Sequence, residues 1–501
     1  MKKEFKIFLY AAIVIFITSC SNDFLEVTPE GMTTEENFYK NESDAKAALT
    51  AVYDLMRKNS GGFENMITMF NAASDDHVAG GGGESDGAGI QSFSNYTINP
   101  YTIPESFWND YYRGIFRANV LLSKLPGIPM DEAVKTRFEA EAKTLRAYYY
   151  FNLVRMFKNV PLITEPLSAS QFYNVPQAAP ADVYAKIEED LLASMDNLPS
   201  TVVVEIDGGR LTKGAAKAIL GKVYLYQGKN TLAAEQFADV NGTPGQTSQY
   251  GYHLLSNFAD LWSFTNKFNT ESILEVSHSA QGSYWGIWGG SSDEGNTVNV
   301  MVGPRSYNKL DNQAPELPSG WSFNVFTQDF YDFMQGDPRF NATLFDLKSL
   351  KTNGHADYIA GYQDTGYFLN KFLPKQADVY DGSLGGDAVL NYAQNTYAIR
   401  LADTYLMEAE ALGGTGTRAQ ALLDAVRARV GLPSVPVSMN AIKDERRREL
   451  AGEGHRWFDL VRWGDAPAKL GSRGFVAGKH EILPIPIKEL SNTIIQQNPN
   501  Y

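Results

Sequence analysis

The stretch "KAILGKVYLYQGKNTLAAEQFADV" (217–240) decides the fold of this chain. Leu220-Gly221 is followed by Tyr224, and Ala233 and Phe237 come later at a regular helical spacing. A residue as small as Gly221 lets two helices approach each other, and Phe237 can fill the gap between them. The stretch therefore predicts two helices packed against each other.

This L-G-x-x-Y … A-x-x-x-F spacing is typical of a tetratricopeptide helix pair. A weaker echo, "RLADTYLMEAEAL" (400–412), contains Leu401-Ala402 and Tyr405, and "TRAQALLDAVRARVGL" (417–432) is its expected partner helix. Helix pairs of this kind stack into a solenoid whose concave side carries other elements. The chain is therefore expected to be mostly α, with tetratricopeptide-like helix pairs forming a solenoid scaffold.

Further helices and two long irregular regions complete this scaffold. Helical stripes of apolar residues occur at 43–58, with Ser43 as the expected N-cap, and at 104–125, 131–157 and 181–198. Between them, 72–103 and 245–395 are rich in glycine, asparagine, serine, aspartate and aromatic residues, with short strand-like runs such as "SILEVSH" (272–278). Irregular insertions of this length are usually functional, so they are predicted to hold the ligand site.

Cys20, the only cysteine, follows a basic start and the apolar run "IFLYAAIVIFI" (7–17). This run is too short for a bilayer, which needs about 18–20 residues. A basic start, a short apolar run and the small residues Thr18 and Ser19 are typical of a signal peptide. We expect residues 1–19 to be this peptide and Cys20 to become the first mature residue, carrying lipid such as palmitate. The alternative is a buried free thiol.

Composition excludes one class of partner. The formal net charge is −14, and removal of Lys2, Lys3, Lys6 and Glu4 with the leader would make it more negative. Nucleic acid needs a basic surface, so no nucleic-acid partner is expected. Attachment to a membrane would depend on the lipid rather than on charge. With 12% aromatic residues, the chain is globular rather than disordered.

Both ends of the chain carry extended motifs. They are "CSNDFLEVTPEGMTTEENFYKNESDAKAALTAVYDLM" (20–56), "DERRRELAGEGHRWFDLVRWG" (444–464) and "LPIPIKELSNTIIQQNPNY" (483–501). The first resembles the mature N-terminus of the SusD/RagB outer-membrane lipoproteins of Bacteroidetes-type bacteria. The second is similar to the family's E-R-x-x-E-x-x-x-E-G-x-R-x-x-D-L-x-R-W helix, and the third to its closing tail.

The resemblance implies a glycan-binding lipoprotein without catalytic activity. Such proteins cover a TonB-dependent (SusC-like) outer-membrane transporter and deliver oligosaccharides to it. The lipid-bearing cysteine of the family corresponds to Cys20, and Asn22-Asp23 after it is similar to the start of surface-exported lipoproteins. One SusD-like domain is expected over 20–501.

Within this domain we expect a helical half at 20–245, a loop-rich ligand-binding region at 246–395 and a helical region with a tail at 396–501. The alternatives are a secreted helical glycoside hydrolase or polysaccharide lyase, and a peptide-binding uptake lipoprotein. The identity, linkage and length of the glycan stay open.

"GSYWGIWGG" (282–290) is the first candidate for ligand binding. Tyr284, Trp285 and Trp288 crowd a segment bounded by glycines, where exposed rings could stack on the C–H faces of sugar rings. Trp321 and Trp262 are further candidates. The alternative is that these rings anchor a long loop to the core, as aromatic residues usually do.

"QSFSNYTINPY" (91–101) is the second candidate for ligand binding. Tyr96, Asn99 and Tyr101 occur in an expected polar loop, where the family places aromatic and amide ligand-binding residues. An asparagine amide offers both a donor and an acceptor to neighbouring sugar hydroxyls. The alternative is ordinary turn chemistry, because "INP" is a common turn signal.

"SDDHVAGGGGES" (74–85) is the third candidate, and it is not a phosphate loop. It lacks the G-x-x-x-x-G-K-[ST] pattern, and its acidic residues would repel phosphate. Asp75 or Asp76 could bind sugar hydroxyls or help to hold a structural calcium ion. A mobile loop is expected at this stretch, and the alternative for Asp75 and Asp76 is that they are solvated loop acids. No other cofactor is expected.

The motif at 444–464 contains several carboxylates and a histidine but is not expected to be catalytic. Its arginines can pair with the carboxylates of four residues that surround His455 in sequence, namely Glu445, Glu449, Glu453 and Asp459. An ion-pair network with Trp457 and Trp463 in the core is predicted, and Trp108 is also expected to be buried. No nucleophile elbow occurs, although carboxylate pairs distant in sequence leave glycoside hydrolysis open.

Overall fold

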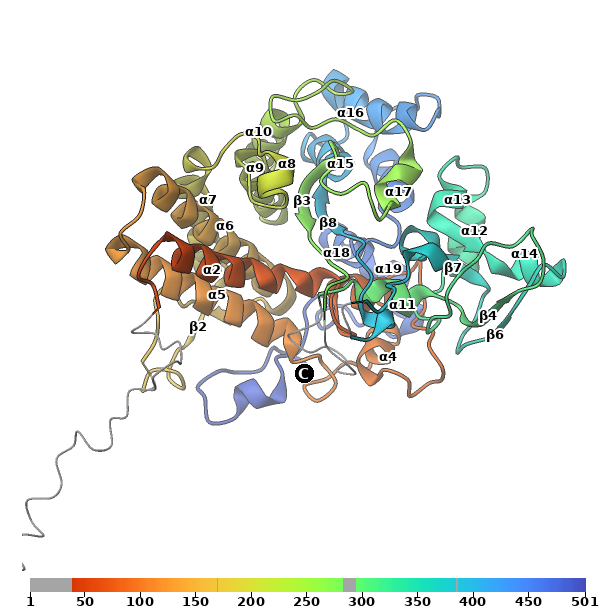
Figure 1. Ribbon diagram of the computed structural model, residues 1–501, viewed down its shortest axis with the longest axis horizontal. Coiled ribbons are helices and arrows are strands. Elements are labelled where there is room, and N and C mark those ends of the chain that lie inside the picture. The colour runs from red at the N-terminus through yellow and green to blue at the C-terminus, as the bar shows by residue number, and fades with distance from the viewer. Residues whose placement is uncertain (1–37, 169, 283–293, 384–385) are drawn as a thin grey trace, which may run out of the picture.

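The computed structural model describes residues 38–501 except 169, 283–293 and 384–385. Its longer helices form the array on the left and top of Figure 1. They are α2 (Glu42–Tyr53), α5 (Ser106–Lys124), α6 (Glu132–Phe157), α7 (Pro180–Ser194), α9 (Lys213–Tyr226), α10 (Asn230–Asn241), α15 (Leu401–Ala411), α16 (Gly416–Arg429) and α17 (Met439–Glu449). No helix among the described residues is long and apolar enough to cross a membrane.

The array grows by packing neighbouring helices. α2 packs on α5, α5 on α6 and α6 on α7, and further along α9 packs on α10, α10 on α15 and α15 on α16. Figure 1 shows this succession from α2 to α16. The prediction of a mostly helical, tetratricopeptide-like scaffold is therefore confirmed, including the helix pair expected from the echo at 400–432.

The α9–α10 pair has the contact that the opening motif predicts. A methyl group added at Gly221 would lie 2.7 Å from Cε1 of Phe237, closer than side-chain carbons normally approach. Phe237 is fully buried. The close approach of the two helices therefore depends on the missing side chain of Gly221.

Gly221→Val is expected to lower the free energy of unfolding by about 1–3 kcal/mol, because the larger side chain overpacks the α9–α10 contact. Chemical denaturation measures this change. Gly471→Val is the control, because a Cβ there meets no atom of the described residues within 4 Å. Equal stability of both variants would contradict the proposed packing role of Gly221.

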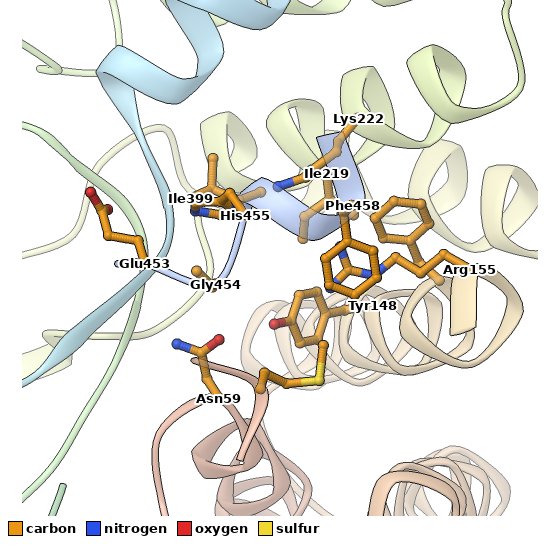
Figure 2. A pocket seen from close by; sticks show the side chains of 13 residues that line it. Asn59, Tyr148, Arg155, Ile219, Lys222, Ile399, Glu453, Gly454, His455 and Phe458 are labelled. Atoms are coloured by element: carbon orange, nitrogen blue, oxygen red, sulfur yellow. The ribbon is translucent and has the colours of Figure 1, made fainter. Parts of the chain in front are cut away.

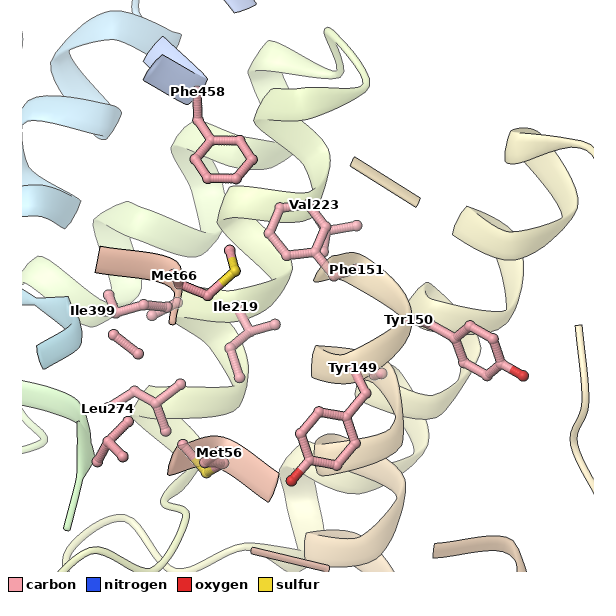
Figure 3. Packing of buried hydrophobic residues seen from close by; sticks show 14 of the residues in the cluster. Met56, Met66, Tyr149, Tyr150, Phe151, Ile219, Val223, Leu274, Ile399 and Phe458 are labelled. Atoms are coloured by element: carbon pink, nitrogen blue, oxygen red, sulfur yellow. The ribbon is translucent and has the colours of Figure 1, made fainter. Parts of the chain in front are cut away.

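The main hydrophobic core lies where the scaffold meets other elements. Phe151 of α6 lies beside Val223 of α9 (Figure 3), whereas Tyr149 of α6 packs on Gly114 of α5. Trp108 and Trp457 are also buried in this core, as predicted. Trp463 differs from the prediction, because it is only half-buried and lies under the charged groups of Lys443 and Arg462.

The remaining elements are short. The helices are α3 (Met66–Ala72), α4 (Ala88–Ser94), α8 (Val204–Asp207), α11 (Thr297–Val302), α12 (Gln328–Met334), α13 (Phe340–Thr343), α14 (Leu347–Thr352), α18 (Arg456–Trp463) and α19 (Ala466–Leu470). The strands are β1 (Val160–Pro161), β2 (Gln177–Ala178), β3 (Ser272–Val276), β4 (Arg305–Lys309), β5 (Leu344–Asp346), β6 (Ala356–Ile359), β7 (Tyr367–Leu369) and β8 (Thr396–Arg400).

The strands form antiparallel pairs rather than a large sheet. The described pairs are β1–β2, β3–β8, β4–β6 and β5–β7. β3 confirms the strand expected in "SILEVSH", and its register sets Ser272 opposite Arg400. The β3–β8 pair thus joins the irregular central region to the C-terminal helices, next to α9.

Two local predictions need correction. Asn41, not Ser43, caps α2, because its side chain accepts a hydrogen bond from the Asp44 amide. The motif at 444–464 forms two helices, α17 and α18, rather than one. The break contains Gly452 and Gly454, whose φ angles of 77° and 82° favour glycine.

Candidate functional site

Several predicted site residues lie outside the described part of the chain. Cys20 falls within residues 1–37, and Tyr284, Trp285 and Trp288 fall within 283–293. The described residues on both sides of 283–293 nevertheless contact one and the same turn. His278 Nε2 lies 2.7 Å from Ser60 Oγ, and the Thr297 amide donates to the Ser60 carbonyl. Both flanks are thus attached to the turn that precedes Phe63.

Trp321 lies beside this turn. Its ring centroid is 6.4 Å from that of Phe63, and Phe63 meets Phe323 edge-to-face at 5.3 Å. Trp321 and Phe63 are both only partly buried. The structure therefore brings a predicted tryptophan and an unpredicted phenylalanine together as an aromatic pair that solvent reaches.

The glycine-rich loop at 74–85 lies beside Phe323, which packs on Phe63 of this aromatic pair. It is tied down rather than mobile, because isolated antiparallel bridges join His77 to Phe326 and Gly80 to Phe323. Gly81 lies against Phe323, where any added Cβ would be 2.5 Å from the ring. The prediction of a mobile loop is therefore wrong for the bridged part.

Polar groups flank the aromatic pair. Arg305 Nη2 donates to Asp86 Oδ2 at 2.7 Å, and Arg305 Nε donates to the Trp321 carbonyl. Asp86 directly follows the glycine-rich loop and accepts a hydrogen bond from the Gly82 amide, so Arg305 connects this loop to the backbone of Trp321. Together these groups form a partly exposed surface of rings and hydrogen-bonding groups, which suits a hydroxyl-rich ligand.

The prediction for Tyr96 as a ligand-binding residue is corrected. Tyr96 is buried, and its hydroxyl donates to the Ala73 carbonyl. Its ring packs edge-to-face on Phe475. The segment 91–101 is also not simply a loop, since α4 continues to Ser94. Tyr96 is a core residue because its ring packs on Phe475 and its hydroxyl is hydrogen-bonded to the Ala73 carbonyl.

Asn99 and Tyr101 have different surroundings. Asn99 Oδ1 accepts a hydrogen bond from the Tyr101 amide, and Asn99 Nδ2 donates to the Thr97 carbonyl. These are the turn contacts named as the alternative to ligand binding. Tyr101 is 79% exposed, but its neighbour Pro100 contacts the C-terminal tail at Ile487. Its contact with a ligand stays a prediction.

Asp75 is not a solvated loop acid, because both of its carboxylate oxygens pair with an arginine. Arg456 Nε and Nη2 donate to its two oxygens at 2.7 and 2.8 Å. Burial raises the pKa of Asp75, but Arg456 and Arg447 outweigh this and lower it overall. Asp76 pairs likewise with Arg447 at 2.7 Å. No group of three or more potential metal ligands occurs among the described residues.

The carboxylates of the 444–464 motif form the predicted ion-pair network. Glu449 Oε1 accepts from Arg400 and Arg429, and Glu449 Oε2 accepts from Arg339 at 2.8 Å. Glu453 pairs with Arg400 and Lys371, and Asp459 pairs with Arg446. These carboxylates serve as buried counter-charges of cations.

The pocket beside His455 also gives no room for a substrate. Its volume is about 30 Å³, and Lys222, His455, Tyr148 and Asn59 lie around it (Figure 2). Burial lowers the pKa of His455 to about 3, so its ring is neutral. A polar space of this size holds a water molecule or two rather than a sugar ring.

Sequence reasoning missed Phe63 and Arg305. Phe63 occurs in "NSGGFEN" (59–65), where glycines precede an aromatic residue as they do in the segment at 282–290. That pattern could have pointed to it. Nothing local distinguishes Arg305, because its role depends on Asp86, which lies far away in the sequence.

Comparisons with known proteins agree with this architecture. Residues 331–501 match the model of the SusD family, and residues 23–225 match a model described as starch-binding associating with outer membrane. A solved structure of a laminarin binding SusD-like protein is 65% identical, with a TM-score of 0.91, and covers 92% of this chain and 100% of that chain.

More distant relatives show the same pattern. Surface glycan-binding protein A from Bacteroides fluxus is 26% identical with a TM-score of 0.79, and the match covers 92% of this chain and 100% of that chain. SusD-like protein P25 of Formosa agariphila is 26% identical over 97% of this chain and 96% of its own length. The similarity therefore extends over nearly the whole chain.

Proposed function

The chain belongs to the SusD family, and from this premise we propose that it is a surface glycan-binding protein whose ligand is a laminarin-type glucan. The observation that carries the proposal is its 65% identity to a laminarin binding SusD-like protein over 92% of this chain. At this identity, two proteins with one fold commonly keep their binding surface.

The geometry around Trp321 supports this function. Sugar rings present apolar C–H faces, which pack on exposed aromatic rings, and their hydroxyls bond to polar groups at the edge. Phe63 and Trp321 offer the rings, and Arg305 and Asp86 offer the polar edge. The segment 282–290, with Trp285 and Trp288, is proposed to add further rings to this site.

We further propose that the protein is anchored at the cell surface beside a transporter. Cys20 is the proposed lipid attachment site, and the lipid would hold the protein on the outer membrane, facing outward. A TonB-dependent transporter of the SusC type is the proposed partner that receives the glycan. We propose a binding role without catalysis, so incubation with laminarin is expected to release no shorter products, as chromatography can test.

Trp321→Ala is expected to weaken binding of laminarihexaose about 5- to 150-fold. Loss of one stacking ring typically costs about 1–3 kcal/mol. Isothermal titration calorimetry of the soluble protein measures the dissociation constant, and a melting curve checks the fold.

Tyr173→Ala is the matched control, since Tyr173 is 59% exposed and lies between β1 and β2. Normal binding by a folded Trp321→Ala protein would show that the site lies elsewhere.

A further inference from the structure

A polar pocket of about 260 Å³ opens next to Phe63. It lies between the 3-10 helix η2 (Asp54–Asn59), the turn at Gly61-Gly62 and the first turns of α5. Phe63 therefore lies next to both the Trp321 ring and this pocket. The volume is slightly below the range of about 300–1,000 Å³ for sites that enclose a drug-sized ligand, so one ring-sized group fits.

A buried lysine, Lys58, lines this pocket. Lys58 is only 6% exposed, and its ammonium lies 5.1 Å from the centre of the Phe107 ring. Among the residues that the structure describes, it donates one hydrogen bond, to Ser106 Oγ at 2.5 Å. Asp110 Oδ2 is 3.6 Å away, beyond hydrogen-bond distance. Since an ammonium carries three donors, the pocket contains donor capacity that the protein uses only in part.

Two carboxylates stand beside this ammonium. Glu64 Oε2 accepts a hydrogen bond of 3.3 Å from Ser106, and Asp110 Oδ1 is 3.5 Å from Arg113. Both distances exceed the roughly 2.7–2.9 Å of a strong charge-assisted contact. Burial lowers the pKa of Lys58, while the neighbouring charges of Asp110 and Glu64 act in the opposite direction. The carboxylates therefore keep acceptor capacity toward the pocket.

This combination suits a group that both accepts and donates hydrogen bonds. A sugar hydroxyl can accept from an ammonium while donating to a carboxylate, and neighbouring hydroxyls on one ring can satisfy both at once. An anionic group is less suitable, because Glu64 and Asp110 would repel it. A neutral hexose ring also has an apolar face that can lie toward Phe63.

We infer that this pocket is a subsite that holds one neutral sugar ring of the glycan, with ring hydroxyls bonded to Lys58 and to the carboxylates of Glu64 and Asp110. The inference rests on the proposed glycan-binding function. The glycan then extends from this pocket over Phe63 to the Trp321 ring. Binding thus requires a chain long enough to reach both places.

The test uses laminarihexaose with the soluble protein and isothermal titration calorimetry. Lys58→Met keeps the apolar stem and removes the donors, and it is expected to weaken binding about 10- to 150-fold, the loss typical of hydrogen bonds to a charged group. Glu64→Gln keeps the shape and removes the charge, and it is expected to weaken binding at least about 5-fold. Lys213→Met, which removes a surface cation paired with Asp196, is the control and is expected to bind normally.

The outcomes separate the inference from the proposed function. Absence of binding by the wild-type protein overturns both. Wild-type binding that Trp321→Ala weakens, together with normal binding by Lys58→Met and Glu64→Gln, overturns the subsite alone. If Lys58→Met does not fold, Glu64→Gln decides, because that side chain is partly exposed and the replacement has the same shape.

Discussion

Replacing Glu449 with alanine is expected to lower the free energy of unfolding by about 3–5 kcal/mol, the cost of breaking a buried ion pair. Glu449 is fully buried and accepts from three arginines, Arg339, Arg400 and Arg429. The variant leaves these cations inside the protein with too few counter-charges. Chemical denaturation measures the loss, and Glu189→Ala is the control.

The control is matched in chemistry but not in environment. Glu189 pairs with Lys186 on α7, but its side chain is 69% exposed, and such surface pairs contribute under about 1 kcal/mol. A large loss for Glu449→Ala and a small one for Glu189→Ala would support the buried network. Similar small losses in both variants would contradict it.

The same network predicts a dependence on pH. Burial by itself raises the pKa of Glu449, but Arg429, Arg400 and Arg339 outweigh this and hold it well below its ordinary value. The folded-state pKa is thus lower than the unfolded one, so the stabilisation is present above the unfolded pKa of about 4.3 and is lost as the pH falls through the folded pKa. The difference in the free energy of unfolding between the wild type and Glu449→Ala should therefore become smaller at acidic pH.

Replacing Cys20 with alanine is expected to move the protein from the membrane fraction to the soluble fraction. The physical reason is the lipid, whose acyl chains supply about 0.8 kcal/mol per buried methylene, whereas an acidic protein has no charge attraction to anionic lipids. Cell fractionation measures the distribution, and labelling with an alkyne-bearing palmitate measures acylation directly. In the variant, both the protein in the membrane fraction and the palmitate label on it should be lost.

Ser21→Ala, the neighbouring residue, is the control and should retain label and location. The experiment is done in cells that lack the transporter, because a bound partner could retain an unlipidated protein. Continued outer-membrane retention of Cys20→Ala under these conditions would contradict lipid anchoring. A melting curve shows that the released protein is folded.

Much of the scaffold follows from sequence patterns. The spacing of Gly221 and Phe237 predicted the α9–α10 contact, and apolar stripes predicted α2, α5, α6 and α7 within a few residues. These predictions depend on contacts between residues close in sequence, which local periodicity reports. The single helix expected at 444–464 was wrong because positive φ angles at Gly452 and Gly454 interrupt it.

The site was less predictable. Trp321 was a candidate, but its partly exposed partner Phe63 and the pocket around Lys58 were not, since they depend on η2, α5 and the segment that follows β4 meeting in space. Tyr96 and Asp75 had residue types suited to binding sugars, yet the fold gave them internal partners, the Ala73 carbonyl and Arg456. The residue type alone does not tell whether the polar groups of a side chain already have hydrogen-bond partners inside the protein.

The sequence by itself determined the helical scaffold, because helix periodicity and a missing side chain at Gly221 act over a few turns of chain. Only the tertiary structure decided which charges meet. Glu449 accepts hydrogen bonds from Arg339 and Arg400, which lie 110 and 49 positions away in sequence. Lys58 likewise donates to Ser106, which lies 48 positions away. A buried charge must be neutralised by whatever group the packing brings within hydrogen-bond distance, and sequence spacing carries no record of that distance.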